Sequence, residues 1–526
     1  MSEKLIQSTS VIGSMTLLSR ISGLLRDVVF AHLLGDRAAA DIFFVALRIP
    51  NFFRRISGEG AFSAAFVPVF TDYRMHRSEA ENARFLQLLI GRFGLALLLA
   101  VVVGVLAAPA LVALIAPGFL AQPEKFELAV SATRITFPYL FFISLVALSA
   151  GMLNTCGRFA APAATPILLN LCLIGAALLL LSDAGARLPP APIALSLGVA
   201  LAGVAQLAFQ IPFLRKERLA IRPRVVARAD DSVARAAHEG VARVFRLTVP
   251  AILGVSVAQI NVLVGTLLAS FLATGSIAWL YYSDRLMEFP VGVFGIALGT
   301  AILPSLSRQR GSDAAFSKTL DWAARWVCLI CVPASVGLIV LAAPMIATIY
   351  FHGTFTENGV RQAAASLIAF AFGLTAIVLV KIFAPGFYAR ENTKTPVRIA
   401  MISMGANIVL CLALVYPLKH VGLALATSLA AYLNAALLYR ALRQERAYRP
   451  EPGWGGFALK VCAAAAGMGA LLWWSGGDAE AWTTMPVWRR AGALLLQVAL
   501  GGAFYFAALR MMGLRLGAMW RVAEER

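Results

Sequence analysis

The chain has 526 residues, of which 60% are hydrophobic and only 14% are charged, and its formal net charge is +19. Charged residues make up roughly a quarter of an average soluble domain, so this composition excludes an array of soluble domains. Charge-free runs such as 159–182 and 421–439 are as long as the ~20 helical residues that cross a bilayer. The sequence therefore predicts an all-α membrane protein.

Hydropathy and turn residues together predict about fourteen transmembrane helices. Their limits are 8–33, 41–71, 93–116, 131–153, 159–182, 188–214, 247–273, 277–307, 326–350, 362–385, 399–418, 421–439, 456–476 and 491–510. The links at 273–276 and 418–420 are so short that they predict tight helical hairpins. No cleavable-signal pattern precedes the first helix, so we expect this helix to remain in the mature protein.

The distribution of basic residues predicts the orientation. With a cytoplasmic N-terminus, the cytoplasmic segments carry far more Lys and Arg than the periplasmic links, which is the bias of inner-membrane proteins. An even number of spans then places both termini in the cytoplasm. The largest basic cluster, at 215–246, is a cytoplasmic loop whose expected partners are anionic membrane lipids. Nucleic acid is the alternative partner of so basic a chain, but charges along one face of a membrane protein disfavour it.

An internal repeat divides the predicted spans into two lobes. The segment 58–68 resembles 295–304, so that Pro68 corresponds to Pro304. Six helices separate the two copies, so both have the same orientation, and we expect two parallel six-helix lobes with the substrate site between them. The expected domains are a first lobe at 1–214, the basic loop at 215–246, a second lobe at 247–440, and two C-terminal helices with the tail at 441–526.

Charged side chains within the spans are concentrated in spans 1, 2 and 8. The bases there are Arg20, Arg26, Arg48, Arg54, Arg55 and Arg285, and the acids are Asp27, Asp41, Glu59, Asp284 and Glu288. A charge at the bilayer centre costs ~2.5–3.5 kcal/mol even on the lenient insertion scale. These side chains are therefore expected to face water, one another or a substrate in a central cavity.

Two interpretations of these charges stay open. One is that interlobe ion pairs hold or gate the transporter, and we assign to it Asp27, Asp41, Arg48, Arg55, Glu59, Asp284 and Glu288. The other is binding of the substrate head group, which we assign to Arg20, Arg26, Arg54 and Arg285. Bases outnumber acids in these spans, and the planar guanidinium matches phosphate oxygens, so an anionic head group is expected.

No catalytic or metal-binding pattern accompanies these charges. Cys328 and Cys331 have the spacing of a redox or zinc motif, but they lie in an apolar run without a second pair or a histidine nearby. Two small apolar residues on one helix are the favoured interpretation. We expect no cofactor and no metal.

Several motifs resemble those of the MurJ (MviN) family, within the superfamily of multidrug, oligosaccharidyl-lipid and polysaccharide exporters. They are SMTLLSRISGLLRD at 14–27, PNFFRR at 50–55, EGAFSAAFVP at 59–68, YYSDRLMEFP at 281–290, GTAILPSLS at 299–307, APGFYAR at 384–390 and KTP at 394–396. The resemblance extends over essentially the whole chain, including the two C-terminal helices.

The resemblance implies a lipid II flippase. Such a protein moves the undecaprenyl-pyrophosphate-linked peptidoglycan precursor from the cytoplasmic to the periplasmic leaflet, and it serves cell wall biogenesis and cell shape. It implies that the four arginines assigned to the head group are required, and that spans 13 and 14 shape a groove for the lipid tail. Some family members are thought to bind sodium through an acid on span 7. Here 247–272 has no acid, and Asn261 is the nearest polar candidate, so coupling to the membrane potential is expected instead.

Two rival functions are considered. Another polyprenyl-linked oligosaccharide flippase or a multidrug antiporter of the superfamily would typically have twelve spans, and an antiporter for cationic drugs should have an acidic cavity. A polytopic glycosyltransferase or polymerase should carry paired acids on a large periplasmic loop, and no predicted periplasmic link is long enough. We therefore expect a transporter rather than an enzyme, acting as a monomer.

Overall fold

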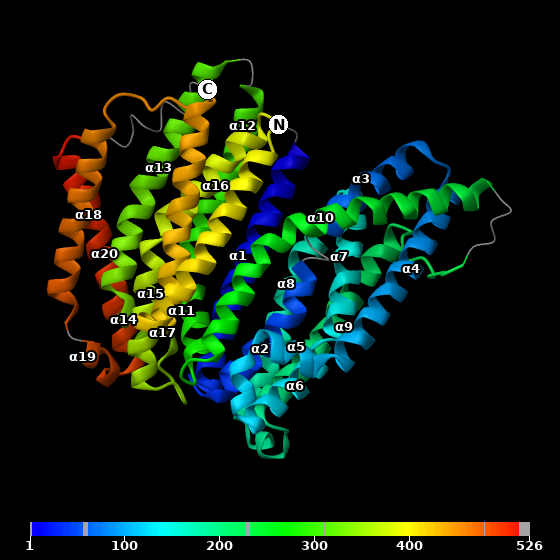
Figure 1. Cartoon of the computed structure of the whole chain (residues 1–526), viewed down its shortest axis with the longest axis horizontal. Coiled ribbons are helices and arrows are strands. Elements are labelled where there is room, and N and C mark those ends of the chain that lie inside the picture. Colours follow the sequence, from blue (N-terminus) through cyan, green and yellow to red (C-terminus); the bar gives the residue numbers. More distant parts are fainter. Residues whose placement is uncertain (1–2, 56–60, 227–231, 310–311, 478, 515–526) are drawn as a thin grey trace. The chain divides into compact units, whose positions relative to one another are not determined.

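The computed structural model describes residues 3–55, 61–226, 232–309, 312–477 and 479–514 (Figure 1). Within these ranges all regular structure is helical, which confirms the predicted all-α class. The chain divides into two compact units, Met1–Thr274 and Gly275–Arg526.

The first unit consists of ten α-helices and two short 3₁₀ helices along its described part. They are α1 (Glu3–Leu34), α2 (Ala38–Arg54), α3 (Ala61–His76), α4 (Glu79–Leu106), α5 (Ala108–Ile115), η2 (Pro117–Ala121), α6 (Pro123–Thr136), α7 (Tyr139–Thr155), α8 (Ala160–Leu181), η3 (Asp183–Arg187), α9 (Ala191–Lys216) and α10 (Ser232–Ser270). Helix α1 packs along α8, and α10 packs against α3 and α4.

The second unit consists of a further run of helices. They are α11 (Ser276–Pro290), the π-helix η4 (Val291–Gly295), α12 (Ile296–Arg308), α13 (Asp313–Val340), α14 (Ala342–Tyr350), α15 (Glu357–Phe372), α16 (Leu374–Tyr388), α17 (Lys394–Gln444), α18 (Trp454–Gly476), α19 (Ala479–Thr484) and α20 (Val487–Met511). The continuous range of α17 contains a sharp bend at Lys419, where φ is 51° and ψ is −132°. The predicted hairpin at 418–420 lies at this bend, and Gly422 contacts the carbonyl of Leu414 across it.

Each predicted span coincides, in its described part, with one to three of these helices, and the spans 399–418 and 421–439 share α17. Nine helices in the described ranges are long and apolar enough to cross a membrane, and the count of fourteen spans stays a prediction. Four predicted spans are each divided between two α-helices, α4 and α5, α6 and α7, α13 and α14, and α15 and α16, and the π-helix η4 separates α11 from α12 within the span 277–307. Pro109, Pro138 and Gly373 lie at three of these junctions. Proline removes a backbone donor and clashes with the preceding turn, which interrupts a helix.

The helix boundaries are consistent with the internal repeat. Helix α2 ends at Arg54 and α11 ends at Pro290, which is the same offset that relates Pro68 to Pro304. The compact units divide the chain after Thr274, so α10 belongs to the first unit, whereas the repeat assigns 247–273 to the second lobe. The predicted lobe boundaries stay a prediction.

Apolar packing holds each unit together. In the first unit Phe62 stacks on Phe93 with ring centroids 4.0 Å apart, and Phe66 stacks on Phe70 at 5.2 Å.

Helix α4 begins with a capping box, in which the Ser78 side chain accepts from the Glu81 amide and Glu81 accepts from the Ser78 amide. This arrangement satisfies backbone donors that a helix start leaves without partners.

Candidate functional site

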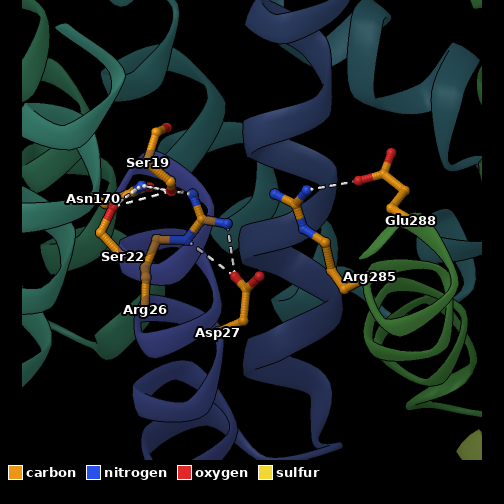
Figure 2. Close-up of polar contacts among 7 residues, drawn as sticks. All are labelled: Ser19, Ser22, Arg26, Asp27, Asn170, Arg285 and Glu288. Carbon is orange, nitrogen blue, oxygen red and sulfur yellow. Dashed lines mark hydrogen bonds and ion pairs between the residues drawn. The ribbon is translucent and has the colours of Figure 1, made fainter. Parts of the chain in front are cut away.

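Arg26 of α1 is the most enclosed of the predicted head-group arginines in the first unit. Arg26 is 5% exposed, and the adjacent Asp27 is 2% exposed. Arg26 Nε and Nη2 donate to Asp27 Oδ1 at 3.0 and 2.7 Å, and Nη1 donates to Asn170 Oδ1 of α8 at 3.0 Å (Figure 2). The carboxylate compensates the buried positive charge, which would otherwise carry a large desolvation cost.

Asn170 is a functional candidate that sequence reasoning missed. Besides accepting from Arg26, its Nδ2 donates to Ser22 Oγ at 2.8 Å and to the carbonyl of Ser19 at 3.2 Å (Figure 2). It therefore fixes both the guanidinium of Arg26 and the preceding turn of α1. The available signal was a lone amide within the apolar run 159–182, because a polar group in a span is retained where it has a partner.

Replacing Asn170 with Leu should lower the free energy of unfolding by about 1–3 kcal/mol, because buried donors of Arg26 lose their acceptor. Thermal or denaturant unfolding of the purified protein measures this change. Leu171→Ala is the matched control, since Leu171 is the next residue and is 54% exposed; a change within about 0.5 kcal/mol is expected there. Equal stability of wild type and Asn170→Leu would contradict the role assigned to Asn170.

Asp41 of α2 forms a buried ion pair that the sequence did not predict. Lys125 Nζ of α6 lies 3.1 Å from Asp41 Oδ2, with side chains 8% and 2% exposed. Lys125 Nζ also lies 4.3 Å from the ring centroid of Phe119 in η2. Both partners belong to the first unit, so the interlobe role assigned to Asp41 stays a prediction.

The remaining bases of α2 contact α10 or their own helix. Arg48 donates to Thr266 Oγ1, and Arg55 Nη1 donates to Gln259 Oε1 at 3.4 Å. Arg54 Nε donates to Asn51 Oδ1 at 3.1 Å and remains partly exposed. Arg20 lies on α1 and is also partly exposed. Glu59 lies outside the described residues.

In the second unit, Arg285 and Glu288 form an ion pair on α11. Arg285 Nη1 lies 2.9 Å from Glu288 Oε2, and the two side chains are 36% and 47% exposed (Figure 2). The Arg285 guanidinium also lies 5.4 Å from the ring centroid of Tyr281. Asp284 precedes Arg285 and is partly exposed. A partly exposed guanidinium is accessible to a ligand that can displace the carboxylate.

The π-helix η4 follows this pair, and Lys381 of α16 lies close to its last residue, Gly295, and to Gly299 of α12. A Cβ on Gly295 would lie 2.9 Å from Lys381 Cδ, and one on Gly299 would lie 3.2 Å from the Lys381 carbonyl oxygen. Glycine at these positions permits the close approach. Short π-helical turns occur frequently at functional sites, and Lys381 is a basic residue that packs against this turn.

The similarity to known proteins extends over nearly the whole chain. The sequence profile of the family described as lipid II flippase MurJ matches residues 30–490. A protein of Vibrio cholerae serotype O1 named "Probable lipid II flippase MurJ" is 42% identical over 98% of this chain and 97% of its own length. One of Burkholderia cenocepacia named "Lipid II flippase MurJ" is 36% identical over 99% of this chain and its own full length.

A solved structure is similar as well. The chain titled "Lipid II flippase MurJ, inward closed conformation" has a TM-score of 0.79 and 27% sequence identity, and the match covers 95% of this chain and 98% of that one. The resemblance predicted from the motifs is thereby confirmed. This chain belongs to the lipid II flippase MurJ family.

Proposed function

We propose that this protein moves lipid II from the cytoplasmic to the periplasmic leaflet of the inner membrane by alternating access. It is a transporter and not an enzyme, because the family to which it belongs consists of lipid II flippases. The observation that carries the proposal is the buried Arg26, whose guanidinium is held by a carboxylate and an amide. Such a group is prepared to bind an anion, because a pyrophosphate with several charges competes well with one carboxylate.

The proposed head-group site consists of Arg20, Arg26, Arg54 and Arg285. Arg26 and Arg285 each have a carboxylate within 3 Å, which balances the charge while no substrate is bound. Arriving phosphate oxygens would replace Asp27 and Glu288 as acceptors, and their departure would restore the ion pairs. Asp41, Arg48, Arg55, Glu59 and Asp284 are the remaining candidates for pairs that change as the two lobes of the repeat move.

The cytoplasmic basic loop is proposed to contact anionic lipid headgroups rather than nucleic acid. Its residues Arg222 and Arg224 are exposed, yet the backbone there is fixed on α4. The Arg224 amide donates to the Gln87 carbonyl at 2.9 Å, and Arg92 Nε donates to the Val225 carbonyl at 3.3 Å. A fixed segment presents its charges to the cytoplasmic leaflet at a lower cost in entropy. Both termini are proposed to be cytoplasmic, and the transporter is proposed to act as a monomer.

Depletion of the protein tests the proposed function. Lipid II should then become inaccessible to a hydrolase added at the periplasmic face, and it should accumulate in the cytoplasmic leaflet. Re-expression of the wild-type chain should restore cleavage, and an empty plasmid should not. Unchanged cleavage after depletion would overturn the proposal. Accumulation of a different polyprenyl-linked oligosaccharide, with lipid II still cleaved, would support the rival flippase function.

A further inference from the structure

The segment 445–453, which connects α17 to α18, is fixed to the rest of the second unit. Arg446 has a positive φ of 55°, and the amides of Ala447 and Tyr448 both donate to the Leu442 carbonyl, at 2.9 and 3.2 Å. Ala447 is 0% and Tyr448 is 2% exposed. A connection between two spans is usually exposed and mobile, so the burial of Ala447 and Tyr448 within this one calls for a physical cause.

The cause is the carboxylate of Asp321 on α13. Asp321 is 0% exposed, and its Oδ1 accepts from Tyr448 Oη at 2.9 Å, from Trp454 Nε1 at 2.6 Å and from the Glu451 amide at 3.2 Å. Its Oδ2 accepts from Arg325 Nε at 2.8 Å, one turn along α13. Burial of Tyr448 raises the pKa of its hydroxyl, and the negative charge of Asp321 raises this pKa further. The Tyr448 hydroxyl therefore stays protonated and remains a donor.

Residues one turn away on α13 complete the attachment. Ser317 Oγ donates to the Arg449 carbonyl at 2.9 Å and accepts from the Arg449 amide at 2.7 Å. Arg325 Nη2 donates to the Pro452 carbonyl at 3.2 Å, and its guanidinium lies 5.3 Å from the ring centroid of Trp454. Ser317, Asp321 and Arg325 are spaced by four residues, so they form one polar stripe along α13.

Beyond this stripe, α18 and α20 lie beside α13 (Figure 1). Leu329 of α13, Val461 and Met468 of α18, and Tyr505 of α20 belong to one buried cluster. Apart from one hydrogen bond, from Tyr505 Oη of α20 to the Leu329 carbonyl at 2.7 Å, this packing is apolar and non-directional, so it tolerates a shift of α18 along α13. A buried carboxylate with four donors does not tolerate such a shift, because any displacement leaves donors without acceptors.

We propose that Asp321 is a positioning residue that sets the register of the helix pair α18 and α20 on α13, and that transport depends on this register. Asp321 need not touch the substrate. The proposal rests on the proposed function where transport is the readout, and it has a second readout that is independent of transport.

The independent readout uses two cysteines of the chain. Cys328 of α13 packs against the buried cluster that contains Val461 of α18, the residue before Cys462, so a short thiol cross-linker between the two cysteines reports the register of α18. In a background in which the other four cysteines, Cys156, Cys172, Cys331 and Cys411, are replaced by alanine, the linked peptides are quantified by mass spectrometry. Lipid II cleavage is measured in the same cells.

The test compares Asp321→Asn with Asp313→Asn, an identical change on α13 at a carboxylate that is 71% exposed and pairs with Arg390. Asp321→Asn should lower both the yield of the Cys328–Cys462 link and the lipid II cleavage by about tenfold, because Tyr448, Glu451 and Trp454 then donate to a neutral oxygen instead of a carboxylate, and the new amide nitrogen faces the Arg325 Nε donor. Asp313→Asn should change neither. If Asp321→Asn fails to accumulate, Tyr448→Phe and Trp454→Phe each remove one donor and should give smaller, parallel losses.

Three results would overturn the proposal. They are an unchanged link with normal lipid II cleavage in Asp321→Asn, an unchanged link with reduced cleavage, and a reduced link with normal cleavage. If depletion of the wild-type chain leaves lipid II cleavage unaffected, the proposed function fails. The cross-linking comparison still shows in that case whether Asp321 sets the helix register.

Discussion

Arg26→Ala should abolish rescue of a depleted strain and reduce periplasmic cleavage of lipid II to the level of the empty plasmid. The substitution removes the donors to Asp27 and Asn170, and with them the guanidinium proposed to bind the pyrophosphate. Each charge-assisted hydrogen bond contributes about 1.5–3 kcal/mol. Loss of two such bonds to the substrate should therefore lower the affinity for lipid II by more than about a hundredfold. Arg26→Lys should rescue only in part, because an ammonium cannot match the planar fork.

A loss of function in Arg26→Ala has two possible causes, which a double variant separates. Arg26→Ala leaves Asp27 buried without the guanidinium that compensates its charge, which destabilises the fold. Arg26→Ala combined with Asp27→Ala removes this unpaired charge and should restore the amount of protein in the membrane, but not lipid II cleavage. Restored cleavage would contradict a role of Arg26 in substrate binding. Arg77→Ala, at an exposed pair with Glu81, is the control and should rescue fully.

The positions of the intramembrane charges could be predicted from the sequence, but their partners could not. A charge in a span carries such a cost that Arg26, Arg48 and Arg285 are conspicuous against an apolar background. Asn170 carries no charge and is inconspicuous, and Lys125 lies next to Pro123 and Glu124 in what reads as an exposed link. Both acquire a role only from tertiary structure, which brings α8 to α1 and α6 to α2.

The same distinction applies to the helices. Hydropathy finds an apolar segment, and the whole of 93–116 satisfies it, although the helix is divided between Leu106 and Ala108. Apolar content is equal on both sides of the division, so only Pro109 indicates it. The attachment of 445–453 was likewise invisible, because Asp321 precedes the predicted span 326–350 and reads as one of many cytoplasmic charges. Its burial depends on a segment more than a hundred residues away.

Asp41→Ala and Lys125→Ala should each lower the free energy of unfolding by about 3–5 kcal/mol, because each leaves a buried charge without its partner. The side chains are 2% and 8% exposed and 3.1 Å apart. A double variant with apolar residues of similar volume, Asp41→Leu with Lys125→Met, should recover most of this loss, since a buried ion pair is often no more stabilising than such residues. Denaturant unfolding of the four proteins measures the losses and their recovery, and single variants as stable as wild type would contradict a buried pair.

Transport by the double variant distinguishes a structural pair from a gating pair. If Asp41 and Lys125 only hold α2 against α6, the stable double variant should flip lipid II at the wild-type rate. If the pair must open during transport, as the sequence-based assignment of Asp41 to gating implies, recovered stability should not bring recovered transport. The first unit contains both partners, and Lys125 also lies over Phe119, which would hold the ammonium in place. We therefore expect recovery of both stability and transport, and a stable but inactive double variant would favour the gating role.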